Sequence, residues 1–275
     1  MMSTRDANGG GQVSCLMVTR LSPGRIDGVK AAIAAFQAQT HPSRELVVVI
    51  DASADAAGRA VLGGMIRTSG PAPVRVIELP GTPTLGELRN RAVAEAAGEY
   101  VCQWDDDDIY HPERVSAQLA ALIEGAHEAV VLQDVLQFFP QQRRLFWTNW
   151  RATQIGGHPG ALFMRRDAPV RYPEAGPEAR LGEDSAVARE LRARARLGAL
   201  AGQPHLFTYV SHGSNSWDAD HHRMLAEKLA ISKGLLARKE AELRAGIAGL
   251  DLGPGPISVC GPNGPVFEIE ATGAG

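Results

Sequence analysis

Long apolar runs are missing from the 275-residue chain, and no stretch approaches the roughly 18 apolar residues that a membrane-spanning helix needs. The first 11 residues are polar and glycine-rich, without the apolar segment of a secretory signal. Repeats and low-complexity segments are also missing. We therefore expect a soluble cytoplasmic protein with a disordered tail over residues 1–11. Peripheral attachment to the inner face of a membrane stays open.

Charge and cysteine content exclude two further classes of protein. The formal net charge of −3 provides no basic surface for nucleic acid. The three cysteines, Cys15, Cys102 and Cys260, fit no zinc-binding spacing. Cys15 and Cys102 lie within apolar segments, which predicts buried, reduced thiols in a reducing compartment.

Apolar segments alternate with amphipathic ones through the first half of the chain. The strand candidates are residues 13–18, 46–50, 74–79 and 99–104, and each precedes a helical pattern. The continuous β-branched run at 46–50 is typical of a parallel strand that is covered on both faces. Four such alternations in about 125 residues predict an α/β fold with a doubly wound, mostly parallel sheet flanked by helices.

The pattern changes after residue 128. Two apolar runs within residues 129–148 could form a hairpin around Pro140-Gln141-Gln142. Further elements are expected as strands at 160–165 and 206–210 and a helix at 184–197. We expect one long polar helix over 220–245 and a loose Gly- and Pro-rich tail from 253, with a turn at 262–264.

Four consecutive aspartates, Asp105 to Asp108, directly follow the strand candidate at 99–104. Ligands of open α/β sheets gather at the carboxyl ends of the strands, so the cluster predicts a site for Mg²⁺ or Mn²⁺. Asp105 and Asp107 can face the same side of an extended chain. A solvated acidic loop is the alternative. An EF-hand is excluded because Tyr110 and Ser116 occupy its glycine and glutamate positions.

Four other groups could carry chemistry, each with a structural alternative. Arg89, at the start of a helix, could bind phosphate or a base edge, or form a surface salt bridge. Asp184, next to Glu183, could act as a general base or cap a helix. His212 could bind a metal or simply pack. Trp147, near Trp150, could offer an aromatic platform to a ligand or belong to the core.

The order of these motifs resembles the GT-A fold inverting glycosyltransferases, the family 2-like enzymes that include polysaccharide and lipopolysaccharide transferases. The matching segments are Val18-Thr19-Arg20, residues 38–41, residues 49–55, residues 87–90, residues 98–108 and Glu183-Asp184. Together they span about residues 13–217. Two departures alter the base pocket. Asp51 stands alone where the family often has two aspartates, and Val18-Thr19-Arg20-Leu21 replaces Pro-Thr-Tyr-Asn.

The resemblance implies transfer of a sugar from a UDP- or GDP-linked donor to a carbohydrate or lipid-linked acceptor, with inversion and with Mn²⁺ or Mg²⁺. Asp107 and His212 would bind the metal, Asp184 would be the general base, and Glu183 stands beside it as the second catalytic residue. The expected donor-binding residues are Thr19, Asp51, Arg89, Asp105, Asp106, His158 and Trp147.

Within one domain, residues 12–128 would be the nucleotide-sugar-binding half and 129–218 the acceptor and catalytic half. Residues 219–275 would add the C-terminal helix and tail, which could mediate homo-oligomer formation or membrane association.

Two other functions compete with this interpretation. A sugar-nucleotide pyrophosphorylase would need a glycine-rich loop after its first strand, whereas Gly9-Gly10-Gly11 precedes it. A non-catalytic nucleotide-sugar-binding module would keep the fold and lose the base, whereas Asp107 and Asp184 are both present.

Overall fold

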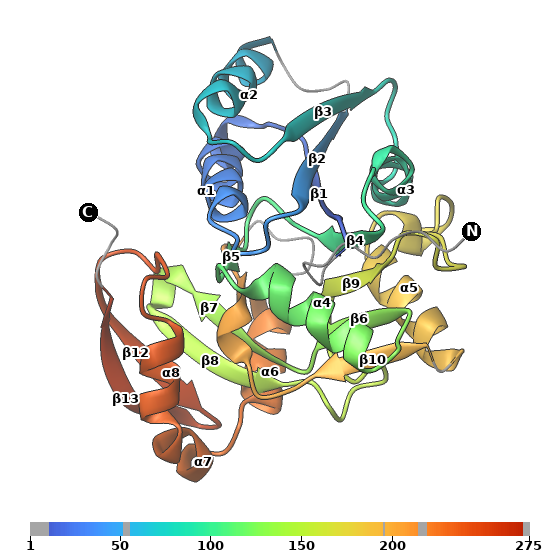
Figure 1. Cartoon of the computed structure of the whole chain (residues 1–275). Helices are drawn as coiled ribbons and strands as arrows, with labels where there is room; N and C mark the ends of the chain where they lie inside the picture. The colour runs from blue at the N-terminus through green and yellow to red at the C-terminus, as the bar shows by residue number, and fades with distance from the viewer. Residues whose placement is uncertain (1–10, 52–55, 195, 214–218, 272–275) are drawn as a thin grey trace.

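The computed structural model describes residues 11–271 except 52–55, 195 and 214–218. Residues 1–10 of the expected disordered tail lie outside this range. A seven-stranded sheet has the order β10-β6-β9-β4-β1-β2-β3 (Figure 1). Its strands are β1 (Val13–Thr19), β2 (Arg44–Asp51), β3 (Val74–Leu79), β4 (Tyr100–Gln103), β6 (Ala129–Leu132), β9 (His158–Arg165) and β10 (Leu197–Leu200). Only β9 runs antiparallel to its neighbours in this sheet, so the predicted mostly parallel α/β class is confirmed.

Helices cover both faces of this sheet (Figure 1). One face packs against α1 (Ile26–Gln37), α2 (Ala56–Thr68) and α4 (Arg114–Glu124), and the other against α3 (Leu85–Glu95) and α5 (Glu183–Ala193). Alternate residues of β2 divide between the two cores: Leu46, Val48 and Ile50 face the first, while Val47 and Val49 face the second. Burial on both faces explains why the strand is apolar at every position.

A six-stranded sheet follows, in the order β13-β12-β8-β7-β11-β5. Its strands are β5 (Ile109–Tyr110), β7 (Asp134–Phe139), β8 (Arg144–Asn149), β11 (Phe207–Val210), β12 (Gly255–Gly261) and β13 (Gly264–Ala271). Strands β7 and β8 form an antiparallel pair around the 3₁₀ turn Pro140–Gln142, which confirms the predicted hairpin. The run that begins at Ala129 is nevertheless divided between the two sheets, since β6 pairs with β9 and β10.

The C-terminal prediction of one helix followed by a loose tail is wrong. The chain forms three helices, α6 (Ala219–Leu229), α7 (Lys233–Arg238) and α8 (Glu240–Gly246). The break at residues 230–232 is explained by long-range pairing, because the Ile231 amide donates to the Trp147 carbonyl at 3.0 Å and the Ser232 side chain caps α7.

Residues 255–271 form the hairpin β12–β13, whose first strand pairs parallel with β8. The predicted turn is confirmed, since Pro262 and Asn263 connect the two strands, with Asn263 at φ 65° and Gly264, the first residue of β13, at φ 114°. Edge pairing and the apolar core under Ile257, Val259 and Ile269 decide the structure here, in spite of the Gly- and Pro-rich composition.

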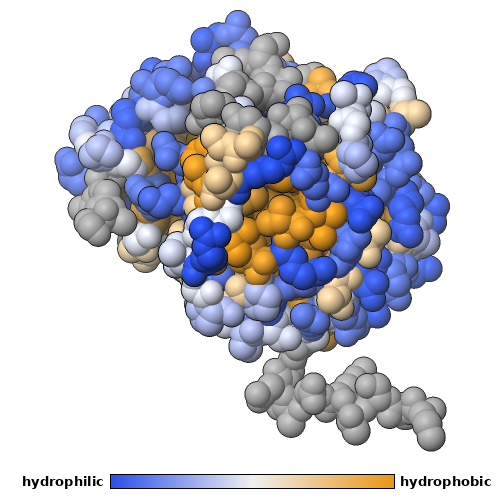
Figure 2. All heavy atoms as spheres, turned by 90° about the horizontal axis from the view of Figure 1, so that it is seen from above, coloured by the Kyte–Doolittle hydropathy of each residue, from blue (hydrophilic) through white to orange (hydrophobic). Residues whose placement is uncertain are grey.

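The surface adds two observations. Seen from above, the molecule shows an apolar area bordered by hydrophilic residues (Figure 2). Val61 of α2 and Val76 of β3 are among the large apolar side chains that remain exposed. In the part of the chain that the structure describes, every helix is too short or too polar to cross a lipid bilayer.

Candidate functional site

The acidic cluster lies between β4 and β5, at the carboxyl end of a central strand of the large sheet. Helix α1 packs directly against its backbone, because a Cβ atom added at Gly28 would lie 2.4 Å from the Asp106 carbonyl oxygen. The helix can approach this closely only with glycine at that position. The predicted location at the sheet edge is therefore present, and the cluster is a packed element whose carboxylates have defined partners.

Asp105 and Glu183 are joined by one guanidinium. Arg89 Nη1 lies 2.7 Å from Asp105 Oδ1, and Arg89 Nε donates to Glu183 Oε1 at 3.1 Å. Arg89 and Glu183 are both buried, at 5 % and 3 % exposure. Gln103 also donates to Asp105, at 2.8 Å. Arg89 thus links two motifs that lie 94 residues apart in the sequence, and its guanidinium is directed at carboxylates rather than at an open base pocket.

Asp106 and Asp107 share a different cation. Arg25 Nη1 lies 2.5 Å from Asp106 Oδ1 and 3.0 Å from Asp107 Oδ2. His212 Nε2 is also 3.0 Å from Asp107 Oδ2. The hydrogen bond from His212 and the charge of Arg25 outweigh the cost of burial and lower the pKa of Asp107. Burial and the charge of Asp107 raise the pKa of Asp106 to about 6.

Asp108 points the other way, toward the second sheet. Its Oδ1 accepts from the Val210 amide of β11 at 2.9 Å. Burial, then the charges of Asp107 and Asp105, raise its pKa. The fully buried Arg114 lies beneath, with its guanidinium 4.8 Å from the Tyr110 ring centroid, and partly offsets that negative charge. Asp108 is therefore placed to hold the two sheets together.

Asp184 is half-buried at the first turn of α5, next to Glu183. Burial and the negative charge of Glu183 raise its pKa to about 7, against the opposing effect of Arg89. The Ser185 amide donates to Asp184 Oδ1 at 2.6 Å. A carboxyl group with this pKa exchanges its proton near neutral pH, which is the property required of a general base.

Thr19 and Asp51 end the neighbouring strands β1 and β2 and are both buried. Thr19 forms a side-chain hydrogen bond with Asp106, and Arg20 Nε lies 3.5 Å from Asp51 Oδ2. These two residues therefore lie at the same edge of the sheet as the acidic cluster. Residues 52–55 of the expected acidic motif lie outside the described part of the chain.

His158 begins β9 within a group of aromatic rings. Its ring centroid is 4.6 Å from that of Trp150 and 5.2 Å from that of Tyr209. Burial lowers its pKa to about 3, so the imidazole is neutral. Gly160 lies between this ring and Gln103, the residue that bonds Asp105. His158 is thus buried close behind the cluster, at 7 % exposure.

The prediction that Trp147 forms an aromatic platform for the donor sugar is wrong. Its ring is 2 % exposed within the core of the second sheet, against Leu136 and Leu236, and its Nε1 donates to Asp134 at 2.9 Å. Lys239 lies over the same ring, 5.1 Å from its centroid. No open ring face is left for a sugar, because α7 and α8 pack on Trp147. A helix was expected over these residues, but the sequence pattern does not reveal that it covers this ring.

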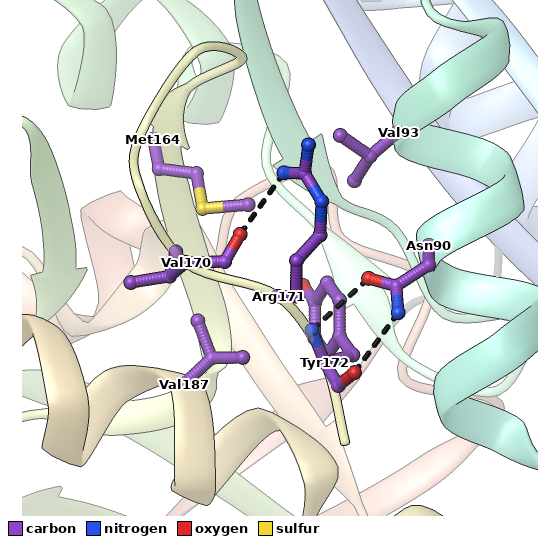
Figure 3. A pocket seen from close by; sticks show the side chains of 7 residues that line it. All are labelled: Asn90, Val93, Met164, Val170, Arg171, Tyr172 and Val187. Atoms are coloured by element: carbon purple, nitrogen blue, oxygen red, sulfur yellow. Dashed lines mark hydrogen bonds between the residues drawn. The ribbon is translucent and has the colours of Figure 1, made fainter. Parts of the chain in front are cut away.

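Asn90, which follows Arg89 in α3, lines a small hollow beside that helix together with Tyr172 (Figure 3). The Asn90 side chain donates to the Tyr172 carbonyl at 2.9 Å and accepts from the Tyr172 amide at 3.0 Å. Asn90 therefore fixes the chain segment that leads toward α5. Arg89, on the same turn of α3, contacts the carboxylates of Asp105 and Glu183. In the Arg89-Asn90 pair, Asn90 therefore holds the backbone in place and Arg89 balances negative charge.

Arg25 is the site residue that the sequence motifs missed. It belongs to the 3₁₀ turn Pro23–Arg25 that follows β1, and it contacts two of the four aspartates. A basic residue in the turn after a sheet strand was the available signal. The sequence predicts the strand β1, but it does not indicate that the turn after it lies next to the end of β4.

A divalent cation fits the outer part of this cluster. Asp107 offers an ionised carboxylate, 24 % exposed, and His212 offers an imidazole beside it. Asp106 Oδ2 is buried with no hydrogen-bond partner among the described residues. Carboxylate oxygen and imidazole nitrogen together suit Mn²⁺ or Mg²⁺. Asp107 and His212 are accordingly the residues that could hold such an ion.

Two solved structures share the fold of this chain. TarS 1–349 of S. aureus in complex with UDP matches with a TM-score of 0.55 and 18 % identity, over 85 % of this chain and 73 % of that one. The mannosyltransferase PcManGT from Pyrobaculum calidifontis, in complex with GDP-Man and Mn²⁺, matches with a TM-score of 0.58 and 15 % identity, over 86 % of this chain and 65 % of that one. These likenesses define the class as the GT-A fold.

The family follows from the sequence. The model of glycosyl transferase family 2 matches residues 16–171, which is more than half of the chain. The chain belongs to this family, and it is a glycosyltransferase. No curated protein sequence matches it.

Proposed function

We propose that the protein transfers a sugar from a UDP- or GDP-linked donor to an acceptor hydroxyl, with inversion and with the help of Mn²⁺ or Mg²⁺. The observation that carries this proposal is the contrast between Asp107, held ionised by Arg25 and His212, and Asp184, whose pKa is raised to about 7. One carboxylate suits a cation and the other suits a proton, which are the two requirements of this reaction.

The donor end of the reaction would lie at Asp107. Asp107 and His212 would hold the cation, which would neutralise negative charge on the diphosphate as it leaves. Arg25 lies 3.0 Å from Asp107 and would move aside or turn to the phosphates. The TarS structures with UDP and with UDP-GlcNAc, and the PcManGT structure with GDP-Man and Mn²⁺, support both the donor class and the metal.

The acceptor end would lie at Asp184. Its carboxylate would accept the proton of the attacking hydroxyl, and direct displacement at the anomeric carbon would invert the configuration. Glu183 is buried and paired with Arg89, so we assign it a positioning role rather than contact with the acceptor. Its charge is also the second cause of the raised pKa of Asp184.

Arg89 and Asp105 would connect the two ends. Because the Arg89 guanidinium bridges Asp105 and Glu183, a shift at the donor sugar would be transmitted to the base-bearing helix. We assign Asp105 to a hydroxyl of the donor ribose or sugar. Thr19 and Asp51, at the ends of β1 and β2, would contact the nucleoside, and His158 would line the donor side from behind Gln103.

The test is a donor screen on the purified protein. UDP-, GDP-, CMP- and dTDP-linked sugars are tested by thermal shift and by release of free nucleotide, with and without Mn²⁺. We expect one UDP- or GDP-linked sugar to raise the melting temperature only with metal, and to be hydrolysed slowly without acceptor. Binding without any nucleotide release, even with a broad acceptor panel, would favour the non-catalytic module.

A further inference from the structure

A second set of potential metal ligands lies outside the acidic cluster. The side chains of His111, Glu113 and His205 offer ligand atoms that all lie within 4.8 Å of one another. The two imidazoles are half-buried, with ring centroids 4.8 Å apart, and Glu113 is exposed. Neither the family motifs nor the proposed transfer reaction uses any of these three residues.

The backbone places the two histidines together. His111 directly follows β5, and His205 lies in η4 (Pro204–Leu206), directly before β11. Strands β5 and β11 pair antiparallel, and the His111 amide donates to the Leu206 carbonyl at 3.2 Å. The ring of His205 is confined by α8, since a Cβ atom added at Gly246 would lie 2.8 Å from it. The proximity is therefore built into the sheet.

The chemistry of the set matches zinc. Two histidines and one glutamate are a known zinc ligand set that leaves a fourth position open. With bonds of about 2.0–2.1 Å, ligand atoms around a tetrahedral ion lie roughly 3.3–3.5 Å apart. The three ligand atoms, now within 4.8 Å of one another, would therefore approach by up to about 1.5 Å on binding. Burial lowers the pKa of both histidines, and for His205 the proximity of His111 adds to this effect.

We propose that His111, Glu113 and His205 bind one Zn²⁺ ion that clips the segment after β5 to η4. The same β5–β11 pair carries the Asp108 contact with Val210, so the clip restrains the strand on which the acidic cluster ends. His205 also packs against α8, since a Cβ atom added at Gly246 would meet its ring, so the proposed ion would lie next to the C-terminal helices. This site is separate from Asp107 and does not depend on the proposed transfer reaction.

The test measures metal binding on the full chain after chelator treatment. Zn²⁺ is titrated against a chromophoric chelator, and Co²⁺ is titrated by its visible absorption, in the Asp107→Ala background that removes the other cation site. We expect one equivalent of Zn²⁺, a tetrahedral Co²⁺ spectrum and a higher melting temperature with Zn²⁺. Absence of a stoichiometric site at micromolar metal would overturn the proposal.

Single variants identify the ligands. Glu113→Gln changes an exposed side chain and should leave the fold intact while weakening Zn²⁺ binding at least about tenfold. His111→Gln and His205→Gln should each abolish the Co²⁺ spectrum. His221→Gln, on α6, is the matched control and should bind as the parent does. Unchanged affinity in both Glu113→Gln and His205→Gln would show that the metal binds elsewhere and would refute the assignment.

Discussion

Two carboxylate pairs in the site contain the same chemical groups and behave in opposite ways. Asp106 and Asp107 have Arg25 and His212 as partners, and Asp107 is held ionised. Glu183 and Asp184 have Arg89, but Arg89 pairs with Glu183, and Asp184 retains a pKa raised to about 7. In the proposed reaction, the position of the cation within each pair would therefore decide which carboxylate binds a metal and which accepts a proton.

Removing the proton acceptor should have the largest effect. Asp184→Asn keeps the shape of the side chain and its bond from the Ser185 amide, but it cannot take up a proton. We expect kcat to fall about 10²–10⁴-fold with donor binding unchanged. The measurement is steady-state transfer together with calorimetric donor binding. If binding and turnover fall together, Asp184 has a structural role.

Removing the metal carboxylate should come next. Asp107→Ala should lower metal-dependent turnover about 10²–10³-fold and weaken nucleotide diphosphate binding in Mn²⁺ buffer. The control is Asp167→Ala, an exposed aspartate whose side chain is 79 % accessible. Parent activity in Asp107→Ala at saturating Mn²⁺ would contradict the metal role.

Replacing Arg25, the counter-ion of Asp106 and Asp107, should have a smaller effect. It should strengthen metal binding, whereas loss of Asp107 should weaken it. In Arg25→Gln the competing positive charge is lost, so the pKa of Asp107 rises and Mn²⁺ should bind about three- to tenfold more tightly without donor. Manganese titration followed by electron paramagnetic resonance measures this. Arg20→Gln, which removes a charge beside Asp51, is the control. Weaker Mn²⁺ binding in Arg25→Gln would mean that Arg25 organises the ligands rather than competing with the ion.

A change in the packing of α1 against the backbone of Asp106 should have the smallest effect. Gly28→Ala should reduce the free energy of unfolding by about 1–3 kcal/mol, because its Cβ would meet the Asp106 carbonyl. Gly24→Ala is the matched control, since no atom lies within 4 Å of a Cβ there. Denaturant unfolding compares the two. Equal stability would show that α1 moves away from the cluster at no cost.

Much of the large sheet was predictable because local periodicity and burial agree there. The β-branched run of β2 and the Thr84 capping box of α3 are signals within single segments. The same holds for the acidic cluster, which follows an apolar strand. Its exact partners were not predictable, since Arg25 and Arg89 reach it from turns and helices distant in sequence.

The second sheet illustrates the limit of local patterns. Residues 255–271 are rich in Gly and Pro, and their strands exist because β12 pairs with β8 more than 100 residues earlier. Trp147 is an aromatic residue of the kind that stacks on sugar rings, yet the helices formed by residues 233–246 cover it. In both cases long-range packing, which no single segment encodes, determined the outcome.

The most direct test of the account is the pH dependence of kcat in the parent and in Glu183→Gln. Because Asp184 must be ionised to act, kcat should fall about tenfold per pH unit below pH 7 in the parent. Loss of the Glu183 charge lowers the pKa of Asp184, so the acid limb should move to lower pH in the variant. An acid limb that stays in place, or that moves to higher pH, would contradict the assignment of Asp184 as the base.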